Sequence, residues 1–530
     1  MNDFVKPTIE YVQLWPLLVV FGIACLEVVV EAFLAREYRF VTQTTLTIGG
    51  LLVALAGVVQ VAGNLDKLGD GVAYGQLTAE GTIAVDGPTV FLWGLLLVLA
   101  LAGTLLFAER QLEGGVSAFA GQASALPGTE AEREASTRGL EHTEVYPLLM
   151  FAVGGMMLFP AANDLLTLFV ALEVLSLPLY LMAGLARRRR LLSQEAALKY
   201  FLLGAFSSGF FLYGVALVYG FAGSMQFAQI NEAVRNDVGN QTLLLIGIGL
   251  LAVGLLFKVG AAPFQAWTPD VYQGAPTPLT AFMAAATKVA AFGAMLRLFY
   301  VAFGADRWSW QPMLWIIAIL TMLVGAVLAI VQTDVKRMLA YSSVAHTGFL
   351  LTGVLGVQSA SDLAVGQVTS LQAVLFYLTT YGFATLGAFA VVTLVRDSGG
   401  EATLLSRWAG LGKESPMVAG VFAFFLLAMA GIPLTSGFVG KWAVFASALS
   451  AGAWPVVLVA VLSSVIAAFF YVRVIWLMYF AEPASDAAAV TQPSILTATA
   501  IGFAVAVTAV LGVLPGPVME LAGRAGEFIR

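Results

Sequence analysis

The feature of this sequence that most limits its fold is a series of long apolar stretches separated by short polar ones. A helix needs about 20 mostly apolar residues to cross a bilayer, and fourteen stretches approach or exceed that length. The chain is 60% hydrophobic and 11% charged, with a mean hydropathy of +0.90, values typical of integral membrane proteins. We therefore expect an all-α polytopic membrane protein of about 14 transmembrane helices. The predicted spans are residues 14–33, 46–62, 90–108, 145–159, 165–185, 196–221, 243–262, 278–303, 314–331, 338–357, 371–395, 417–449, 455–480 and 495–514.

The loops carry their positive charge unevenly, and this predicts the orientation of the chain. Short cytosolic loops of membrane proteins are enriched in Lys and Arg. With the N-terminus outside, fourteen cations fall in inner loops and six in outer segments. The inner ones are Arg36, Arg39, Arg110, Arg133, Arg138, Arg187, Arg188, Arg189, Arg190, Lys336, Arg337, Arg396, Arg407 and Lys413, and the outer ones are Lys6, Lys67, Arg235, Arg307, Arg524 and Arg530.

Two predicted spans are interrupted by helix breakers, each beside a lysine. In the seventh, Gly260 and Pro263 follow Lys258, and in the twelfth the breakers within residues 431–437 precede Lys441. Proline removes a backbone donor and clashes with the preceding turn. Broken helices at corresponding places in two halves of a membrane protein indicate an internal repeat and a transport site. Because these breaks lie five spans apart, an odd number, we expect two inverted five-helix repeats.

The repeat hypothesis divides the chain into five parts. Other polar residues recur at a similar offset: Lys258 to Lys441 is 183 positions, Lys288 to Arg473 is 185, and Glu173 to His346 is 173. The predicted parts are helices 1–3 in residues 1–108, a cytosolic loop in 109–144, the first repeat (helices 4–8) in 145–303, the second repeat (helices 9–13) in 304–480, and helix 14 with the C-terminus in 481–530. The loop is rich in Ala, Gly, Ser and Glu, so we expect a solvated, flexible or marginally helical insert. A docking element for a partner is the alternative.

Ionisable residues inside the predicted spans indicate the function. Four of the eight lysines, Lys199, Lys258, Lys288 and Lys441, lie in such spans, and Glu173 adds a buried acid. A lysine at the bilayer centre costs about 2.5–3.5 kcal/mol on insertion scales. Groups this costly usually mark an ion or proton path, which is the function we predict.

The residue types suggest an order for a proton relay. Burial favours the neutral amine of Lys258, while a nearby carboxylate favours its ammonium form, and we expect Glu173 to be that partner. A short displacement of Glu173 would then turn Lys258 from a proton holder into a donor. Lys288, among small residues, would receive the proton, and Lys441 would be the terminal relay. His346 would bridge the two halves, since imidazole accepts and donates protons near neutral pH.

Some of these residues also have a purely structural interpretation. Lys199 follows Glu195 by four residues, so a local ion pair or snorkelling competes with a role in transport. His346 alone is more often a hydrogen-bonded core histidine, and a single buried lysine is often part of a structural ion pair.

Four further charged residues are expected to be structural. Glu27 and Glu31 lie near the inner end of the first span and suggest an interfacial polar patch. Arg297 and Arg473 lie nearer to helix ends than the four lysines and favour a role as membrane anchors.

The chain offers little for redox or metal chemistry. It has one cysteine, Cys25, and two histidines, His142 and His346, which are far apart. This excludes an internal disulfide and argues against a metal site or a cluster held by this chain's cysteines. Any redox chemistry is therefore expected in a partner.

Three segments resemble the antiporter-like subunits of respiratory complex I, the NADH:quinone oxidoreductase. They are FKVGAAPFQAWTPDVYQGAP at 257–276, TDVKRMLAYSSVAH at 333–346 and GIPLTSGFVGK at 431–441. The resemblance covers most of spans 4 to 13, and the run 267–276 is most similar to one particular subunit type. One position differs: Gln265 stands where family members often have histidine, and glutamine orients water but does not titrate.

The resemblance has implications for fold, site and partners. It implies fourteen spans with two inverted repeats and proton translocation driven by quinone reduction elsewhere, in the bacterial cytoplasmic membrane. The family's glutamate–lysine pair, central lysine and terminal lysine correspond to Glu173, Lys258, Lys288 and Lys441. The partners implied are other membrane subunits, including further antiporter-like ones, and the lipid bilayer, without nucleic acid. No cofactor is expected in this chain, while flavin, iron–sulfur clusters and quinone are expected in partner subunits.

Two other functions remain open. A subunit of a multi-subunit cation/proton antiporter would share the fold and the lysines. A structural membrane subunit that does not pump would tolerate neutral substitutions of Lys258 and Lys441.

Overall fold

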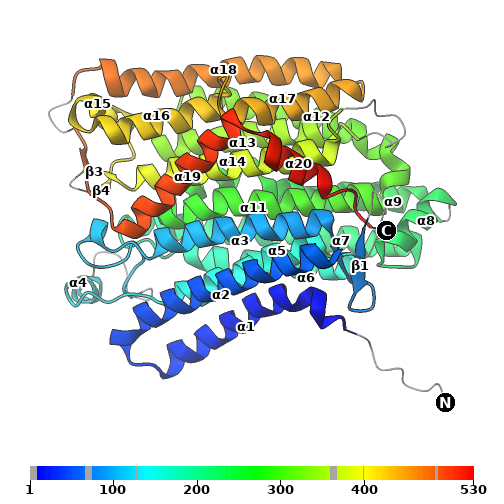
Figure 1. Cartoon of the computed structure of the whole chain (residues 1–530), viewed down its shortest axis with the longest axis horizontal. Coiled ribbons are helices and arrows are strands. Elements are labelled where there is room, and N and C mark those ends of the chain that lie inside the picture. Colours follow the sequence, from blue (N-terminus) through cyan, green and yellow to red (C-terminus); the bar gives the residue numbers. More distant parts are fainter. Residues whose placement is uncertain are drawn as a thin grey trace.

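The structure is a computed structural model, and it shows a bundle of helices lying side by side (Figure 1). It describes residues 9–65, 74–122, 125, 129–237, 239–357, 367–397, 399–483 and 487–529. Lys6, Lys67 and Arg530, counted above as outer cations, lie outside the described residues. The helices are α1 Tyr11–Phe33, α2 Arg36–Leu65, α3 Gly87–Phe107, α4 Glu130–Thr137, α5 Val145–Ala161, α6 Leu165–Ala183, α7 Arg190–Ala222, α8 Phe227–Arg235, α9 Gln241–Val259, α10 Trp267–Gly274, α11 Thr277–Arg297, α12 Arg307–Ile330, α13 Val335–Val354, α14 Ser370–Val392, α15 Leu411–Glu414, α16 Pro416–Ala430, α17 Ser436–Ser450, α18 Trp454–Phe480, α19 Ile495–Val513 and α20 Gly516–Arg524.

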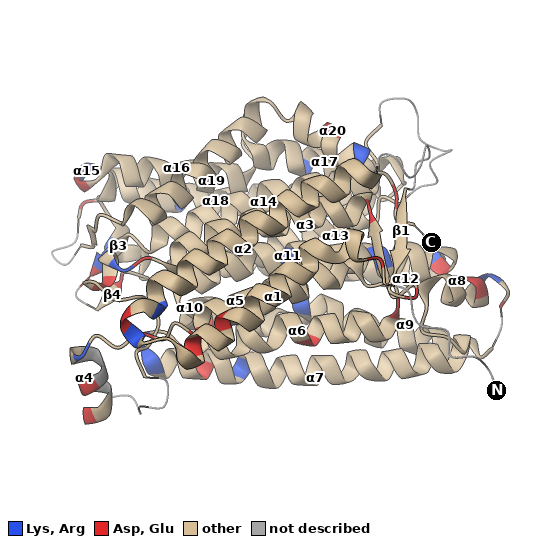
Figure 2. Cartoon of the chain, turned by 60° about the horizontal axis from the view of Figure 1, so that its bottom comes forward, with Lys and Arg blue, Asp and Glu red and all other residues tan. Residues whose placement is uncertain are grey.

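The predicted membrane class is confirmed in its main feature. Within the described residues, eleven helical segments are long and apolar enough to cross a membrane, and α5 and α16 are shorter apolar helices. Charged residues lie mainly toward the two ends of the bundle, whereas its middle has few of them (Figure 2). This is the distribution expected of a chain that spans a bilayer. The total of 14 spans stays a prediction.

The centre of the bundle is formed by α11 and α14. Every residue of α11 is buried, as is every residue of α14 except Gln372, and α11 packs against α3, α5 and α14. The outer helices α7 and α18 instead expose large apolar side chains on one face, among them Phe206, Val465 and Phe469. Such faces suit contact with lipid or with other membrane subunits. Lys288, on α11, therefore occupies the middle of the protein.

Both predicted helix breaks are present. α9 ends at Val259, where Gly260 takes a left-handed conformation (φ +72°), and a short turn leads into α10. α16 ends at Ala430 before Gly431 (φ +80°), and α17 begins at Ser436. Glycine adopts this backbone conformation without the steric cost of a Cβ atom. Each break places backbone groups and a lysine inside the bundle.

Small strands appear where an all-helical chain was expected, but they are confined to loops. β1 (Gly75–Thr78) and β2 (Ile83–Asp86) form an antiparallel hairpin, and β3 (Val395–Asp397) pairs with β4 (Gly400–Glu401) and β5 (Ala489–Val490). β1 and the β3–β4 pair lie at opposite ends of the bundle (Figure 1).

The described part of the 109–144 loop is fastened to the body of the protein. Glu113 forms ion pairs with Arg188 (2.8 Å) and Arg396. Arg110 pairs with Glu141 at 3.0 Å. We call the end of the bundle that carries Arg39, Arg110, Arg188 and Arg396 the arginine-rich end.

Candidate functional site

Lys258 is held in a buried polar pocket at the end of α9. Its Nζ donates a hydrogen bond to Ser176 Oγ on α6 at 2.7 Å. The ammonium also lies 5.4 Å from the ring centre of Tyr180 and 5.6 Å from that of Tyr200, within the range of cation–π attraction. Aromatic faces and a hydroxyl thus replace the water that Lys258 loses on burial.

Glu173 lies near Lys258 without touching it. It stands three residues before Ser176 on α6, and its charge acts on Lys258 at a distance. Its Oε1 atom is buried and has no hydrogen-bond partner among the described residues. The structure therefore places Ser176 as the direct contact of Lys258, with Glu173 on the same helix.

Lys288 is connected to the end of α9, next to Lys258, through one hydroxyl group. Its Nζ donates to Thr347 Oγ1 and to the carbonyl oxygen of Ser343, both on α13. The Thr347 hydroxyl in turn donates to the carbonyl oxygen of Val259 at 2.8 Å, and Val259 follows Lys258 in the chain. Thr347 thus joins the central lysine to the broken end of α9.

His346 is surrounded by tyrosines. Its Nδ1 lies 2.7 Å from the Tyr377 hydroxyl, and its Nε2 lies 3.2 Å from the Tyr471 hydroxyl. The histidine is within electrostatic range of both Lys288 and Lys441. Both the bridging role and the alternative of a hydrogen-bonded core histidine are compatible with these contacts.

Lys441 lies at the second broken helix. We call Lys258, Lys288 and Lys441, with His346, the lysine row. Its Nζ donates to the carbonyl oxygen of Ala430, the last residue of α16, at 2.8 Å and to Ser464 Oγ on α18 at 2.9 Å. The ammonium lies 4.9 Å from the ring centre of Phe349. The helix break therefore supplies a backbone acceptor to a buried ammonium, a group that is costly to bury unpaired.

Lys199 is set apart from the other three lysines. Its side chain is 41% exposed and pairs with Glu195 and Asp270, each at 2.7 Å. Asp270 also pairs with Arg337 at 2.7 Å. The local pair expected from the Glu195–Lys199 spacing is confirmed, and Asp270 extends it into a network.

Arg297 is not at an interface, so its interpretation as a membrane anchor is wrong. Its side chain is fully buried and forms an ion pair with Asp86 at 2.7 Å. It also donates to the carbonyl oxygen of Pro160 at 2.7 Å. Arg473, the other predicted anchor, is exposed.

Several contacts in the row were not predicted. Ser176 had a usable signal, because a residue three positions after Glu173 shares its helix face. The other contacts had none, because hydroxyl and aromatic residues are common in membrane helices and the distances between these helices are not visible in the sequence. The unpredicted side chains are Ser176, Tyr180, Tyr200, Thr347, Phe349, Tyr377, Tyr381, Ser464 and Tyr471.

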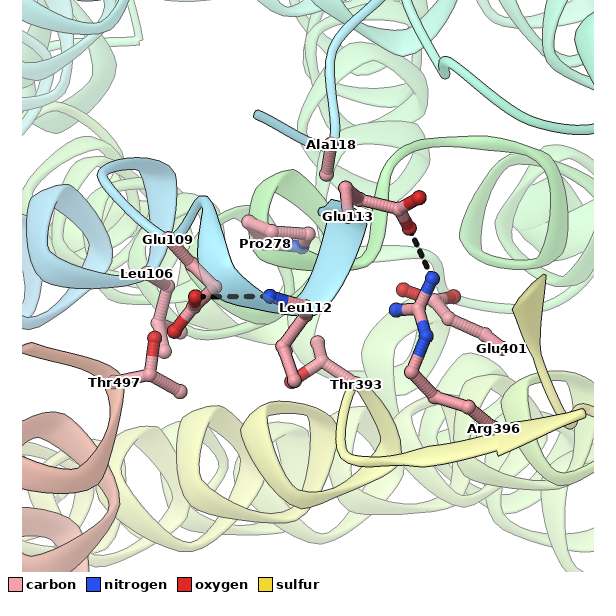
Figure 3. A pocket seen from close by; sticks show the side chains of 10 residues that line it. All are labelled: Leu106, Glu109, Leu112, Glu113, Ala118, Pro278, Thr393, Arg396, Glu401 and Thr497. Atoms are coloured by element: carbon pink, nitrogen blue, oxygen red, sulfur yellow. Dashed lines mark hydrogen bonds and ion pairs between the residues drawn. The ribbon is translucent and has the colours of Figure 1, made fainter. Parts of the chain in front are cut away.

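Two small cavities lie at the arginine-rich end. One has a volume of about 20 Å³ and is lined in part by Glu109, Glu113 and Arg396. Figure 3 shows Glu113 pointing toward Arg396 across it. The other has a volume of about 50 Å³ and is lined in part by Lys336 and Glu401. Among the described residues, no group of three or more His, Cys, Asp or Glu side chains is arranged to hold a metal ion.

The comparisons with known proteins identify the family. A family profile described as "NADH:quinone oxidoreductase/Mrp antiporter, TM" matches residues 162–467. The chain belongs to this family. A curated relative from Nocardioides sp. is 76% identical over 532 residues, covering 100% of both chains, and is named NADH-quinone oxidoreductase subunit N.

Solved structures agree with this assignment. A chain of respiratory complex I from Thermus thermophilus, with bound aureothin, is 32% identical with a TM-score of 0.74, covering 97% of this chain and 100% of that one. A chain of the Mrp complex from Dietzia sp. has a TM-score of 0.78 at 21% identity, covering 98% and 97%. The second likeness concerns the fold alone.

Thr347→Val is expected to slow proton transfer between Lys258 and Lys288. Valine matches the shape of threonine but removes the hydroxyl that accepts from Lys288 and donates to Val259. Hydrogen bonds to charged groups contribute about 1.5–3 kcal/mol, so we expect proton uptake to fall about tenfold in membrane vesicles. Thr352→Val is the control, because the Thr352 hydroxyl bonds within α13 to Gly348 at 3.0 Å. Equal rates in the two variants would contradict a role for Thr347.

Proposed function

We propose that this chain is the proton-translocating membrane subunit of an NADH:quinone oxidoreductase, of the type called subunit N. The observation that carries the proposal is the set of three buried lysines, Lys258, Lys288 and Lys441, each held by polar groups of neighbouring helices. NADH oxidation and quinone reduction would take place in partner subunits that hold the flavin, iron–sulfur clusters and quinone. Full-length identity of 76% to a protein named subunit N supports the assignment, and it is the subunit type predicted from the run 267–276.

The contacts support a relay that runs across the bundle. Ser176 links α6 to Lys258, and Thr347 links the end of α9 to Lys288. His346 is within electrostatic range of both Lys288 and Lys441. In this proposal Glu173 controls the first step. When it approaches, Lys258 keeps its proton, and when it withdraws, burial favours release to the next group. Lys199, at the exposed edge, would guide protons toward the row.

We further propose that the chain forms fourteen spans with two inverted five-helix repeats. The starts of α6 and α13 support the repeat, because Asp164 caps α6 and Asp334 caps α13 through side-chain contacts with two backbone N–H groups each. Each aspartate also forms an isolated backbone bridge, to Gln226 and to Leu404 respectively. The two broken helices, α9–α10 and α16–α17, are a second matching pair.

The same proposal includes the topology and the partners. The N-terminus would lie outside, with the arginine-rich end in the cytosol of a bacterial cell. The exposed apolar faces of α7 and α18 and the fastened 109–144 loop would contact lipid and other membrane subunits, including further antiporter-like ones. The boundaries 1–108, 109–144, 145–303, 304–480 and 481–530 would separate the parts described above.

A subunit of a cation/proton antiporter is the second candidate, because the matching family profile covers both NADH:quinone oxidoreductase and Mrp antiporter proteins. Deletion of the chain from its own organism separates the two functions. We expect NADH-driven proton uptake by inside-out vesicles to disappear, and to return on expression of the chain. Cation-driven proton exchange measured without NADH should not change. Loss of this exchange with NADH-driven uptake intact would favour the antiporter.

A further inference from the structure

Glu27 is a buried acid outside the lysine row, on α1. An interfacial patch was expected here, but Glu27 is 0% exposed, so that expectation is wrong for this residue. It lies where α1 packs against α2 and α5. Among the described ion pairs none involves Glu27, and the nearby Arg39 is paired with Glu31 at 2.6 Å. An ionised carboxylate buried without a cation is strongly unfavourable.

The contacts of Thr47 suit a protonated Glu27. The Thr47 Oγ1 atom lies 2.6 Å from Glu27 Oε1 and 2.9 Å from the carbonyl oxygen of Gln43. A hydroxyl has one hydrogen to donate and two lone pairs to accept, so it cannot donate to both oxygens. If Thr47 donates to Gln43, the short contact with Glu27 requires a hydrogen from the carboxyl group. A protonated Glu27 satisfies both contacts at once.

The neighbouring amide of Gln43 has no hydrogen left to donate to the Glu27 carboxyl group. Gln43 Nε2 donates to the backbone oxygen of Glu27 at 2.9 Å and to Glu31 Oε2 at 3.0 Å, which uses both of its hydrogens. Glu27 Oε2 and Gln43 Oε1 are buried and have no hydrogen-bond partner among the described residues. Buried acceptors of this kind are usually satisfied by internal water. The site therefore has groups suited to bind a proton and water.

The site is connected to the arginine-rich end. Glu31, one turn of α1 beyond Glu27, is bonded to Gln43, to Arg39 and to the Thr143 hydroxyl, the last at 2.7 Å. Arg39 and Glu31 are partly exposed. The charged and titratable groups around the site from the elements packed on it are Glu31 on α1, Arg39 on α2, Tyr146 on α5, and Arg110 and Glu141 in the adjoining loop.

We propose that Glu27 is a second proton-binding site, separate from the lysine row, which exchanges its proton with water at the arginine-rich end, on the side of Glu31. Among the described hydrogen bonds, none joins Glu27, Thr47 or Gln43 to Lys258, Lys288 or Lys441. The inference goes beyond the proposed function and does not depend on it.

Infrared spectroscopy of the assembled complex tests the proposal. The C=O stretching band of a protonated carboxyl is distinct from the bands of a carboxylate. We expect Glu27→Gln to remove one protonated-carboxyl band from the spectrum, and Thr47→Val to shift that band because its hydrogen-bond partner is lost. Raising the pH in wild type should diminish the same band reversibly.

Glu31→Gln is the matched control, because Glu31 is ion-paired and is expected to contribute a carboxylate band. If Glu27→Gln removes a carboxylate band instead, Glu27 is ionised and the proposal is wrong. If the Glu27 variant does not assemble, Thr47→Val decides, and a protonated-carboxyl region identical to that of wild type overturns the proposal.

Discussion

Lys258→Ala is expected to assemble into the complex and to lose most of its coupled activity. The substitution removes the ammonium that donates to Ser176 and that interacts electrostatically with Glu173. A positioned proton-transfer group commonly contributes on the order of 100-fold to its step, so we expect both NADH oxidation and proton uptake to fall at least about tenfold. Inside-out membrane vesicles allow both rates to be recorded in one sample, with assembly checked on a native gel.

A second substitution at this position separates proton transfer from structural charge. Arginine keeps the positive charge but does not release its proton in proteins. If Lys258 only balances the charge of Glu173, Lys258→Arg should restore the activity that alanine loses. If Lys258 carries protons, arginine should fail as alanine does.

The exposed Lys413, which pairs with Glu482 at 3.2 Å, provides a matched control. Lys413→Ala removes a lysine far from the buried row and should leave both rates near those of wild type. Wild-type rates in an assembled Lys258→Ala complex would show that the lysine is structural. That result would favour the function of a non-pumping membrane subunit.

The sequence predicted the membrane fold well because its strongest signals are long and local. An apolar stretch of spanning length has few alternatives to a transmembrane helix, and the breaks near Gly260 and Gly431 follow from glycine and proline within such stretches. The strands β1 to β5 were missed because each is only two to four residues long. Strands of that length have too little alternation of polar and apolar residues to be recognised.

The lysines of the candidate site were predicted from the sequence, but most of their contacts were not. Buried lysines are rare in apolar stretches, so Lys258, Lys288 and Lys441 were evident from the sequence alone. Their contacts depend on how helices pack, and the hydroxyl of Thr347 reaches a backbone oxygen 88 positions away. The positions of Glu27 and Arg297 near the ends of predicted spans also suggested that they lie at the interface, because a charge near the end of a span usually faces water. In the structure both side chains are instead buried, and each contacts a residue distant in the sequence: Thr47 for Glu27 and Asp86 for Arg297.

Arg297→Met is expected to destabilise the protein more than any other single change at an arginine described here. Arg297 and Asp86 are both fully buried, and the pair joins α11 to the start of α3. Asp86 also accepts from the backbone N–H of Thr89 and of Ile529, each at 3.1 Å, which ties the C-terminal segment to the same point. Removal of one partner leaves an uncompensated buried charge, and the cost is about 3–5 kcal/mol.

The double variant Asp86→Asn with Arg297→Met tests whether that cost arises from the unpaired charge. It should recover part of the stability lost by Arg297→Met, because replacing both partners of a buried pair removes the isolated charge. Thermal inactivation of the purified complex and the amount of assembled complex in membranes both measure the effect. Arg473→Met is the control, since this arginine is exposed and donates to the carbonyl oxygen of Ile330 at 2.7 Å. If Arg297→Met and Arg473→Met inactivate at the same temperature, the buried pair does not stabilise the junction between α11, α3 and the C-terminal segment.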